Sequence, residues 1–298
     1  MSSEELLEQF LNYLSVEKGL RPKSLEAYRR DLQDWIDFSK EQGRTIIDST
    51  VEGLLQRFSI HMHDKGLSPR SMARKSSALK GFYRFLLREG ITDFDPTAIL
   101  ERPKIGRPLP KVMTIEEIER ILKQPDEKTA LGLRDKAMLE LLYATGIRES
   151  ELISLKLGDV NTVAEFLSVE GKGGRERVVP VGSFALSAID EYLLKGRPKL
   201  CKDITERTLF LNPYGKPISR MGIWKVIKKY SLMAGISHDI SPHVFRHSCA
   251  THLLEGGASI MAVQEILGHV DVSTTQIYTH LTAKDLKDIH KKTHPRGE

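Results

Sequence analysis

Residues 94–110 read Phe-Asp-Pro-Thr-Ala-Ile-Leu-Glu-Arg-Pro-Lys-Ile-Gly-Arg-Pro-Leu-Pro and divide the chain into two parts. The stretch contains prolines at positions 96, 103, 108 and 110, with basic residues at 102, 104 and 107. Since proline fixes φ and has no backbone N–H, such a segment interrupts helix and favours a stiff, extended connection. We therefore predict two domains, at residues 1–106 and 107–298.

The composition is that of a globular protein and excludes several other classes. A chain of 298 residues, 40% hydrophobic and 29% charged, is long enough for two domains and too apolar for wholesale disorder. It contains no run of eighteen apolar residues and does not open with a secretory signal. Two cysteines, Cys201 and Cys249, exclude a disulfide scaffold and a cysteine-rich zinc module. We expect a cytoplasmic protein with no membrane partner.

Four helical patterns fill the part before the boundary. They span residues 2–19, 24–40, 50–65 and 69–89. The first opens with a capping-box pair, Ser2 and Glu5, and stops at Gly19. The sequence Lys-Gly-Leu-Arg-Pro-Lys-Ser of residues 18–24 returns as Lys-Gly-Leu-Ser-Pro-Arg-Ser at 65–71, each time leading through a proline into a helix. Because two copies are too few for a repeat array, we predict two helical hairpins.

The fourth of these helices has a one-sided charge distribution. Between residues 65 and 88 there are seven basic residues and no acidic one. At 100° per residue, five of the cations lie within about 120° of each other, opposite the apolar residues: Arg70, Arg74, Lys80, Arg84 and Arg88. The face could simply be solvated, but the absence of acids favours a face that contacts phosphate groups. The net charge of +5 is weak additional support for a polyanionic partner.

The part after the boundary is predicted to be mainly helical with a small β insert. A capping box formed by Thr114 and Glu117 restarts helix. Residues 166–170 and 177–181 have the pattern of two strands around a glycine-rich turn at 171–174. Further helices are expected at residues 184–194, 220–234, 242–254, 260–267, 274–279 and 283–291. The predicted fold class is mainly α, with a small antiparallel β-sheet in the second domain.

Several basic side chains of this part stand beside a helix end or a turn. Arg148 follows Thr-Gly-Ile at the junction of two predicted helices, and Lys172 lies at the tip of the hairpin. His243 and Arg246 are three residues apart, which places them on one helix face. Their helix is expected to begin with Ser241 as N-cap, followed by a proline.

A second histidine and a tyrosine complete the candidate set. His269 follows Leu-Gly at a predicted helix end, and Tyr278 comes nine residues later. Two arginines, two histidines and a lysine gathered together would suit a phosphodiester, whose transition state concentrates negative charge on its oxygens. The cations would favour ionisation of a phenol, which could then form a covalent phosphoryl intermediate. The lysine could donate a proton to the departing oxygen.

Each of these residues also has a simpler structural interpretation. Arg148 could cap a helix or pair with a neighbouring glutamate, Lys172 could be a solvated turn residue, and a lone tyrosine is most often a core aromatic. His243 and His247 are spaced like zinc ligands, but no acidic residue accompanies them, so no metal is expected. We assign structural roles to His247 and His252. The glycine-rich turn lacks the spacing of a nucleotide P-loop.

In chain order, these residues resemble the active-site pattern of the tyrosine recombinase (phage integrase) family. That pattern is Arg, Lys on a β-hairpin, His-x-x-Arg, Leu-Gly-His and Tyr. It is found here as Ala-Thr-Gly-Ile-Arg-Glu-Ser-Glu-Leu at 144–152, Gly-Lys-Gly at 171–173, Ser-Pro-His-Val-Phe-Arg-His-Ser at 241–248, Leu-Gly-His at 267–269 and Thr-Thr-Gln-Ile-Tyr-Thr-His at 274–280. Residues 250–258 and 294–296 look like the XerC/XerD branch.

The resemblance implies a role for each of the six positions. Four would bind and stabilise the scissile phosphate: Arg148, His243, Arg246 and His269. Lys172 would be the general acid for the 5′ oxygen, and Tyr278 the nucleophile that forms a 3′-phosphotyrosyl bond. No metal ion, cofactor or ATP is implied.

The resemblance also implies an architecture and partners. A SAM-like core-binding domain and a catalytic domain would form a C-shaped clamp around a duplex DNA recombination site. Four protomers on two sites, alone or with a sister recombinase, would exchange strands through a Holliday junction, each donating its C-terminal helix near 283–291 to a neighbour. The implied task is resolution of chromosome dimers at cell division, often with an FtsK-type DNA translocase.

Other functions remain as alternatives. A phage or mobile-element integrase of the same family differs in biological role rather than chemistry. A catalytically silent DNA-binding module would explain the basic helix but not the ordered set of six residues. A histidine-metal hydrolase would use His243 and His247 but would leave Tyr278 without a role.

Overall fold

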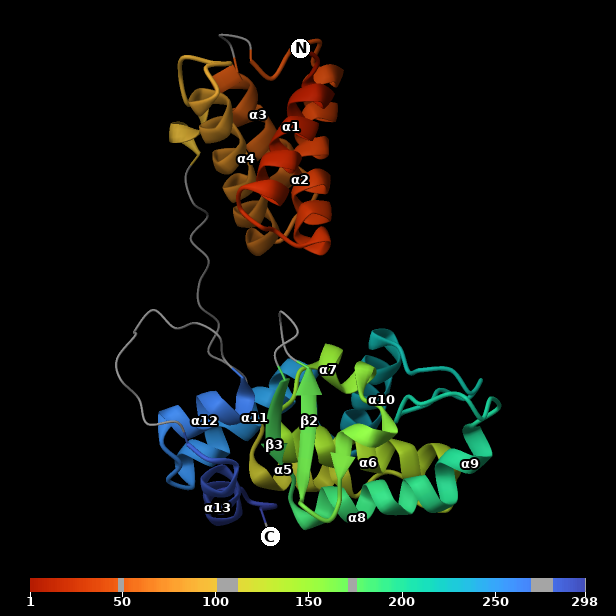
Figure 1. The fold of residues 1–298 in the computed structure, drawn as a ribbon. Helices are drawn as coiled ribbons and strands as arrows, with labels where there is room; N and C mark the ends of the chain where they lie inside the picture. The colour runs from red at the N-terminus through yellow and green to blue at the C-terminus, as the bar shows by residue number, and fades with distance from the viewer. Residues whose placement is uncertain (48–50, 101–111, 171–175, 269–280, 298) are drawn as a thin grey trace. The chain divides into compact units, whose positions relative to one another are not determined.

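The computed structural model describes residues 1–47, 51–100, 112–170, 176–268 and 281–297. The chain forms two compact units, Met1–Pro108 and Leu109–Glu298 (Figure 1), each with its own hydrophobic core. The predicted boundary between residues 106 and 107 lies outside the described residues and stays a prediction. Among the helices that the structure describes, none is long and apolar enough to cross a membrane.

The first unit contains the four helices that the sequence predicts. They are α1 (Ser3–Val16), α2 (Pro22–Glu41), α3 (Val51–Asp64) and α4 (Pro69–Arg88). Ser2 and Glu5 form the predicted capping box, and both α2 and α4 begin at the expected prolines. A short 3₁₀ helix, η1 (Pro96–Ile99), was not predicted; it begins where the Asp95 carboxylate accepts a hydrogen bond from the Thr97 backbone N–H.

A buried aromatic pair fixes α4 against α2. The indole of Trp35 donates a hydrogen bond to the Tyr83 hydroxyl at 3.1 Å, and that hydroxyl donates to the Ile46 carbonyl at 2.7 Å. Both rings are almost fully buried, and burial raises the pKa of Tyr83. Because Tyr83 and its apolar neighbours face inward, the opposite side of α4 with its cations faces outward.

The second unit is mainly helical with a small sheet, which confirms the predicted fold class. Its longer helices are α5 (Ile115–Leu122), α6 (Ala130–Thr145), α7 (Glu149–Ser154), α8 (Ser183–Glu191), α10 (Arg220–Met233), α11 (Pro242–Glu255), α12 (Ile260–Leu267) and α13 (Ala283–Thr293). The predicted helix at 184–194 is longer than expected, since α8 continues through a π turn, η3 (Tyr192–Gly196), into α9 (Arg197–Leu200). The predicted helix at 274–279 lies outside the described residues.

The sheet has three antiparallel strands in the order β1-β2-β3. They are β1 (Val160–Asn161), β2 (Phe166–Glu170) and β3 (Glu176–Pro180), with Leu167 opposite Val179 and Glu170 opposite Glu176. The sequence predicts β2 and β3 but not the two-residue β1, which is too short to show an alternating pattern. A 3₁₀ turn, η2 (Leu157–Asp159), leads into β1.

Helix α6 is the centre of the second unit and positions the candidate site. Its residues are almost all buried, and it packs against α8 and α11 (Figure 1). It ends at Gly146, whose φ of 56° is the left-handed conformation that glycine adopts readily. A Cβ at Gly146 would lie 2.5 Å from the Leu267 side chain. The chain therefore turns tightly between α6 and α7, close to the end of α12.

Histidines anchor the C-terminal helix α13 to α6 of the same chain. His290 Nε2 lies 2.8 Å from the Ala144 carbonyl, and His294 Nε2 lies 3.2 Å from the Tyr143 carbonyl. The two imidazoles stack with centroids 4.7 Å apart, and His252 Nδ1 lies 2.9 Å from the Tyr143 hydroxyl. In the single chain, α13 packs on β3 and α11. The donation of this helix to a neighbouring protomer, which the resemblance implies, stays a prediction.

This histidine cluster predicts a pH-dependent stability. Burial lowers the pKa of His252, His290 and His294, so these groups stay neutral in the folded protein at pH values where the unfolded chain binds protons. We expect the free energy of unfolding to fall between pH 7 and pH 5.5, by up to about 1.4 kcal/mol per histidine. Urea unfolding followed by circular dichroism at several pH values would measure it.

A glutamine variant provides the matched comparison for this cluster. The amide nitrogen of glutamine can donate to the carbonyls that His290 and His294 contact but takes up no proton in this range. The double variant His290→Gln/His294→Gln should therefore lose part of the pH dependence, while His63→Gln, at an exposed position of α3, should keep all of it. Equal pH dependence in all three proteins would contradict the assignment.

Candidate active site

Arg148 lies at the start of α7, where the chain leaves the buried helix α6. Its Nη1 donates to Glu151 Oε1 at 2.9 Å, and its Nη2 donates to the Gly268 carbonyl at 2.8 Å. The Arg148 backbone N–H donates to Glu151 Oε2 at 2.8 Å. The side chain is 36% exposed, so it retains access to solvent. The helix junction and the pairing with a neighbouring glutamate both agree with the structural interpretation made from sequence.

Arg246 lies on α11, and its guanidinium joins the ends of two other helices. Nη1 donates to the Gly146 carbonyl at the end of α6, and Nη2 donates to the Leu267 carbonyl at the end of α12, both at 2.6 Å. Burial, together with the nearby positive charge of Arg148, lowers the pKa of Arg246 to about 10. At neutral pH the guanidinium is still protonated, and its partial desolvation strengthens its attraction for an anion.

The two arginines meet at the C-terminus of α12. Arg246 binds the carbonyl of Leu267, and Arg148 binds that of the next residue, Gly268. Carbonyls at a helix C-terminus carry partial negative charge and attract cations. A guanidinium has five N–H donors, so each arginine retains donors after these contacts. Two positive groups are thus held side by side where an anionic ligand could be bound by both.

The histidines on α11 differ in their surroundings. Ser241 is the N-cap residue and Pro242 the first residue of α11, as predicted, although the serine hydroxyl makes no capping bond. His243 is exposed, one turn before Arg246 on the same helix. His247 is also exposed, so the structural role predicted for it is wrong, because its position on α11 faces away from the core. Within the described ranges, no metal-binding group of His, Cys, Asp or Glu is found.

Three of the six predicted catalytic residues lie outside the described residues. These are Lys172, His269 and Tyr278. Their flanking elements are described: β2 ends at Glu170, β3 begins at Glu176, and α12 ends at Leu267, two residues before His269. The structure therefore brings Arg148 and Arg246 together and places His243 on the same helix as Arg246, while the positions of the other three stay predictions.

Two residues near these arginines were not identified from sequence as parts of the site. Glu151 is buried, and hydrogen bonds from Arg177 and Arg148 hold its pKa below the ordinary value although burial alone would raise it. Arg177 on β3 donates from Nη1 and Nη2 to the two Glu151 oxygens, both at 2.9 Å. A glutamate three residues after Arg148 was visible in the sequence as a pairing partner, whereas Arg177 entered the sequence analysis only as the first residue of the predicted strand at 177–181.

The basic face of α4 is only partly available for a ligand. Arg74 pairs with the buried Asp31, Lys80 donates to the Leu100 carbonyl at 2.9 Å, and Arg88 contacts Glu17, Glu89 and the ring of Tyr13. Arg70 and Arg84 are exposed and have no partner among the described residues. Of the five predicted cations, these two therefore remain as the strongest candidates for phosphate contacts.

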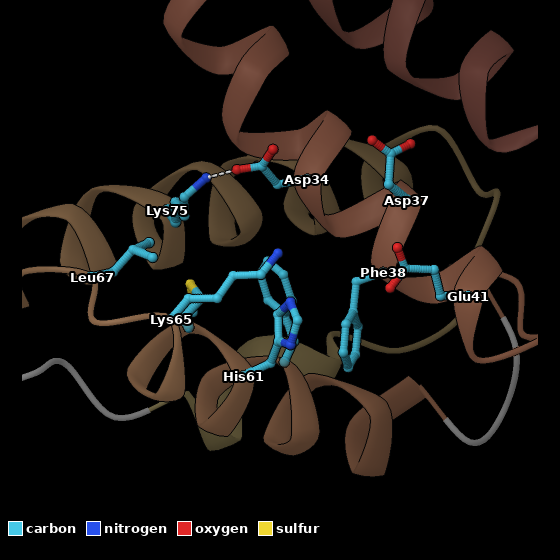
Figure 2. A pocket seen from close by; sticks show the side chains of 10 residues that line it. Asp34, Asp37, Phe38, Glu41, His61, Lys65, Leu67 and Lys75 are labelled. Carbon is cyan, nitrogen blue, oxygen red and sulfur yellow. Dashed lines mark hydrogen bonds and ion pairs between the residues drawn. The ribbon is translucent and has the colours of Figure 1, made fainter.

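The first unit also contains a cavity of about 210 Å³ with several acidic side chains in its lining. Figure 2 shows these side chains. Asp34, Asp37 and Glu41 line it from α2 and face Lys65, which directly follows α3, and Lys75 of α4. Lys75 is mostly buried and forms an ion pair with Asp34. Because three carboxylates would repel phosphate, this side of the helical unit is a poor DNA surface, and two of the seven cations counted in the sequence belong to it.

Comparison with known proteins gives the class of the chain. Residues 111–285 match the phage integrase family, and residues 7–90 match the phage integrase N-terminal SAM-like domain. A crystal structure of the XerH site-specific recombinase bound to a palindromic difH substrate has a similar fold, with a TM-score of 0.70 and 24% identity over 96% of this chain and 83% of that chain. The chain therefore belongs to the phage integrase family.

Relatives of higher identity define the branch of the family. Tyrosine recombinase XerD of Staphylococcus epidermidis is 44% identical over 292 residues, or 98% of this chain and 99% of the relative. Tyrosine recombinase XerD of Halalkalibacterium halodurans is 44% identical over 293 residues, or 98% of each chain. The protein is a site-specific tyrosine recombinase of the XerC/XerD kind, an enzyme that exchanges DNA strands.

Proposed function

We propose that the six residues singled out from the sequence carry out DNA cleavage and rejoining through a 3′-phosphotyrosyl intermediate. Arg148, Arg246, His243 and His269 bind the scissile phosphate and stabilise the charge that develops on its oxygens. The phenolic oxygen of Tyr278 attacks phosphorus, and the bond from phosphorus to the 5′ oxygen breaks. Lys172 donates a proton to that leaving oxygen. The free 5′-hydroxyl of a partner strand then reverses the step, and tyrosine leaves.

The observation that carries this proposal is that Arg148 and Arg246 both donate hydrogen bonds to carbonyls at the C-terminal end of α12. Both guanidiniums are held by neutral carbonyls there, so a doubly contacted phosphate would meet two preorganised cations. Arg246 has no carboxylate among its hydrogen-bond partners in the described residues. Glu151 neutralises part of the charge, yet Arg148, Arg177 and Arg246 together still exceed it.

The biological setting belongs to the same proposal. We assign the protein a cytoplasmic role in resolving chromosome dimers at cell division, on recombination sites in duplex DNA. Residues 1–106 would bind DNA, and residues 107–298 would catalyse strand exchange. Four protomers would act on two sites, with or without a sister recombinase, and an FtsK-type translocase would regulate them.

The full-length similarity to XerD proteins supports this setting over the integrase alternative. The XerD relatives are 43–44% identical over 98–99% of this chain, whereas a lambda integrase dimer bound to a COC′ core site is 20% identical, with a TM-score of 0.69. The lower similarity to lambda integrase shows a shared fold and does not indicate a shared biological role.

Covalent trapping tests the proposed chemistry. A nicked suicide duplex releases a short fragment after cleavage, which prevents rejoining and leaves the enzyme attached to DNA. We expect the wild-type enzyme to form this complex with EDTA present, detected as a band of reduced mobility on a denaturing gel. Cleavage that requires a divalent metal ion would support the hydrolase alternative and contradict the proposal.

Charge reversal on α4 tests the proposed DNA-binding face. Arg84→Glu should weaken binding to duplex DNA and lower the slope of log K against log salt by about one, because one phosphate contact is lost. Arg57→Glu makes the same change in net charge at an exposed position on α3 and serves as the control. Fluorescence anisotropy at several salt concentrations would measure both. Equal slopes for the two variants would favour a solvated face.

A further inference from the structure

We infer that Arg177 on β3 is a positioning residue for DNA cleavage, because it contacts both groups that bind the Arg148 side chain. The inference rests on the proposed function, since it concerns how one phosphate-binding arginine is kept in place. Arg177 is not proposed as a phosphate ligand. Its side chain is much less exposed than that of Arg148, so it is poorly placed to meet an incoming phosphate.

The first contact is the Glu151 carboxylate, which lies between two guanidiniums. Arg177 binds it in a bidentate manner, Nη1 to Oε1 and Nη2 to Oε2, each at 2.9 Å. Arg148 uses the same two oxygens, through Nη1 at 2.9 Å and its backbone N–H at 2.8 Å. Bidentate pairing fixes the orientation of a carboxylate as well as its position. Arg177 thereby fixes the orientation in which the Glu151 carboxylate accepts hydrogen bonds from Arg148.

The second contact is the backbone of Gly268, whose carbonyl accepts a hydrogen bond from Arg148. A Cβ built on Gly268 would lie 2.7 Å from Arg177 Nε and 2.8 Å from its Cζ. The guanidinium of Arg177 therefore lies directly against this residue and leaves no room for a side chain. Its Nε is buried without a hydrogen-bond partner among the described residues. Arg177 thus lies beside the residue whose carbonyl accepts the second hydrogen bond of Arg148.

Charge explains why Arg148 depends on this support. The Glu151 side chain is 5% exposed and that of Arg177 is 14% exposed, against 36% for Arg148. A buried carboxylate without enough positive charge around it is strongly destabilised. If Arg177 were lost, Arg148 would be the remaining guanidinium on Glu151. It would be drawn toward that carboxylate and away from an incoming phosphate.

The experiment compares two suicide duplexes that differ at the scissile position. One carries the ordinary phosphate, and the other a methylphosphonate, in which a methyl group replaces a charged oxygen. An arginine that neutralises this charge matters less for the second duplex. We expect Arg177→Met to slow cleavage of the phosphate roughly 10- to 100-fold, as expected for a misplaced catalytic group. Cleavage of the methylphosphonate should fall by less than about threefold.

Control variants separate positioning from a general structural defect. Arg134→Met removes another buried guanidinium of the same unit, one that binds Asp135 and the Leu211 carbonyl. It should lower the melting temperature but leave both cleavage rates near wild type. Arg177→Lys keeps the charge but not the bidentate geometry, and should give an intermediate loss on the phosphate. If Arg177→Met does not fold, Arg177→Met/Glu151→Gln removes both buried charges. Arg148 then lacks the carboxylate that holds it in place, so the double variant should show the same preference for methylphosphonate.

The outcomes distinguish the inference from the function on which it rests. A wild-type enzyme that cleaves neither duplex would overturn both. Wild-type cleavage of the phosphate, combined with an equal loss on both duplexes in Arg177→Met, would overturn the inference alone. No loss on either duplex would do the same. A selective loss on the phosphate would support it.

Discussion

Arg246→Ala is expected to slow covalent DNA cleavage by about 10³-fold, the upper range for loss of one group that stabilises charge in a transition state. Arg246 combines two functions in one side chain. In the proposed mechanism it presents a partly desolvated cation to the phosphate, and in the structure it joins the ends of α6 and α12 through the carbonyls of Gly146 and Leu267. Alanine removes both, so phosphate binding and the position of the α12 terminus change together.

Arg246→Lys should recover little of this activity. A lysine is a point charge on a flexible chain and cannot reproduce the planar fork that reaches two carbonyls in fixed directions. Single-turnover cleavage of a suicide duplex would give the rates, and thermal unfolding would show that the variants are folded. A rate for Arg246→Ala within about tenfold of wild type would mean that Arg246 serves mainly to hold the helices.

Arg148→Ala is expected to slow cleavage by roughly 10²- to 10³-fold, with a smaller effect on the fold. Its contacts explain the difference. Arg148 is more exposed than Arg246, and after its loss Glu151 keeps the bidentate pair with Arg177. The buried carboxylate is therefore still neutralised, and the main change is one missing cation at the phosphate.

The melting temperature provides the check on this interpretation. We expect Arg148→Ala to lower it less than Arg177→Met does, since the second variant leaves a buried carboxylate with its weaker, more exposed partner. Affinity for an uncleavable duplex should change little, because most binding free energy comes from other phosphate contacts. A large loss of stability in Arg148→Ala, with normal cleavage by the folded fraction, would contradict the proposed role.

Local sequence signals predicted most of the fold. Capping boxes at Ser2 and Thr114 mark helix starts that the structure confirms, and α12 has the predicted bounds, 260–267. These features depend on residues within one helical turn of each other, so they are visible in sequence. Short elements were missed, among them η1, η2 and β1, which are four, three and two residues long. Such short elements have too few residues for periodicity.

The candidate site was predicted less completely, for a physical reason. Sequence order suggested Arg148 and Arg246, but not that they bind consecutive carbonyls of α12. Arg177 is 26 residues from Glu151 in sequence, and their pairing depends on how β3 packs near α7. Long-range ion pairs of this kind leave no periodic signal. For the same reason, the sequence did not reveal that Arg74, Lys80 and Arg88 on α4 already have ion-pair or hydrogen-bond partners.

The central claim is that a tyrosine attacks a phosphate held by Arg148 and Arg246, and the site of the covalent bond tests it most directly. Trypsin cleaves after Arg246 and after Lys284, and the peptide between them, residues 247–284, contains Tyr278 as its single tyrosine. Mass spectrometry of the trapped wild-type complex should locate the DNA-derived phosphate on Tyr278, and Tyr278→Phe should form no complex. A phosphate on any other residue, or trapping by Tyr278→Phe, would contradict the account.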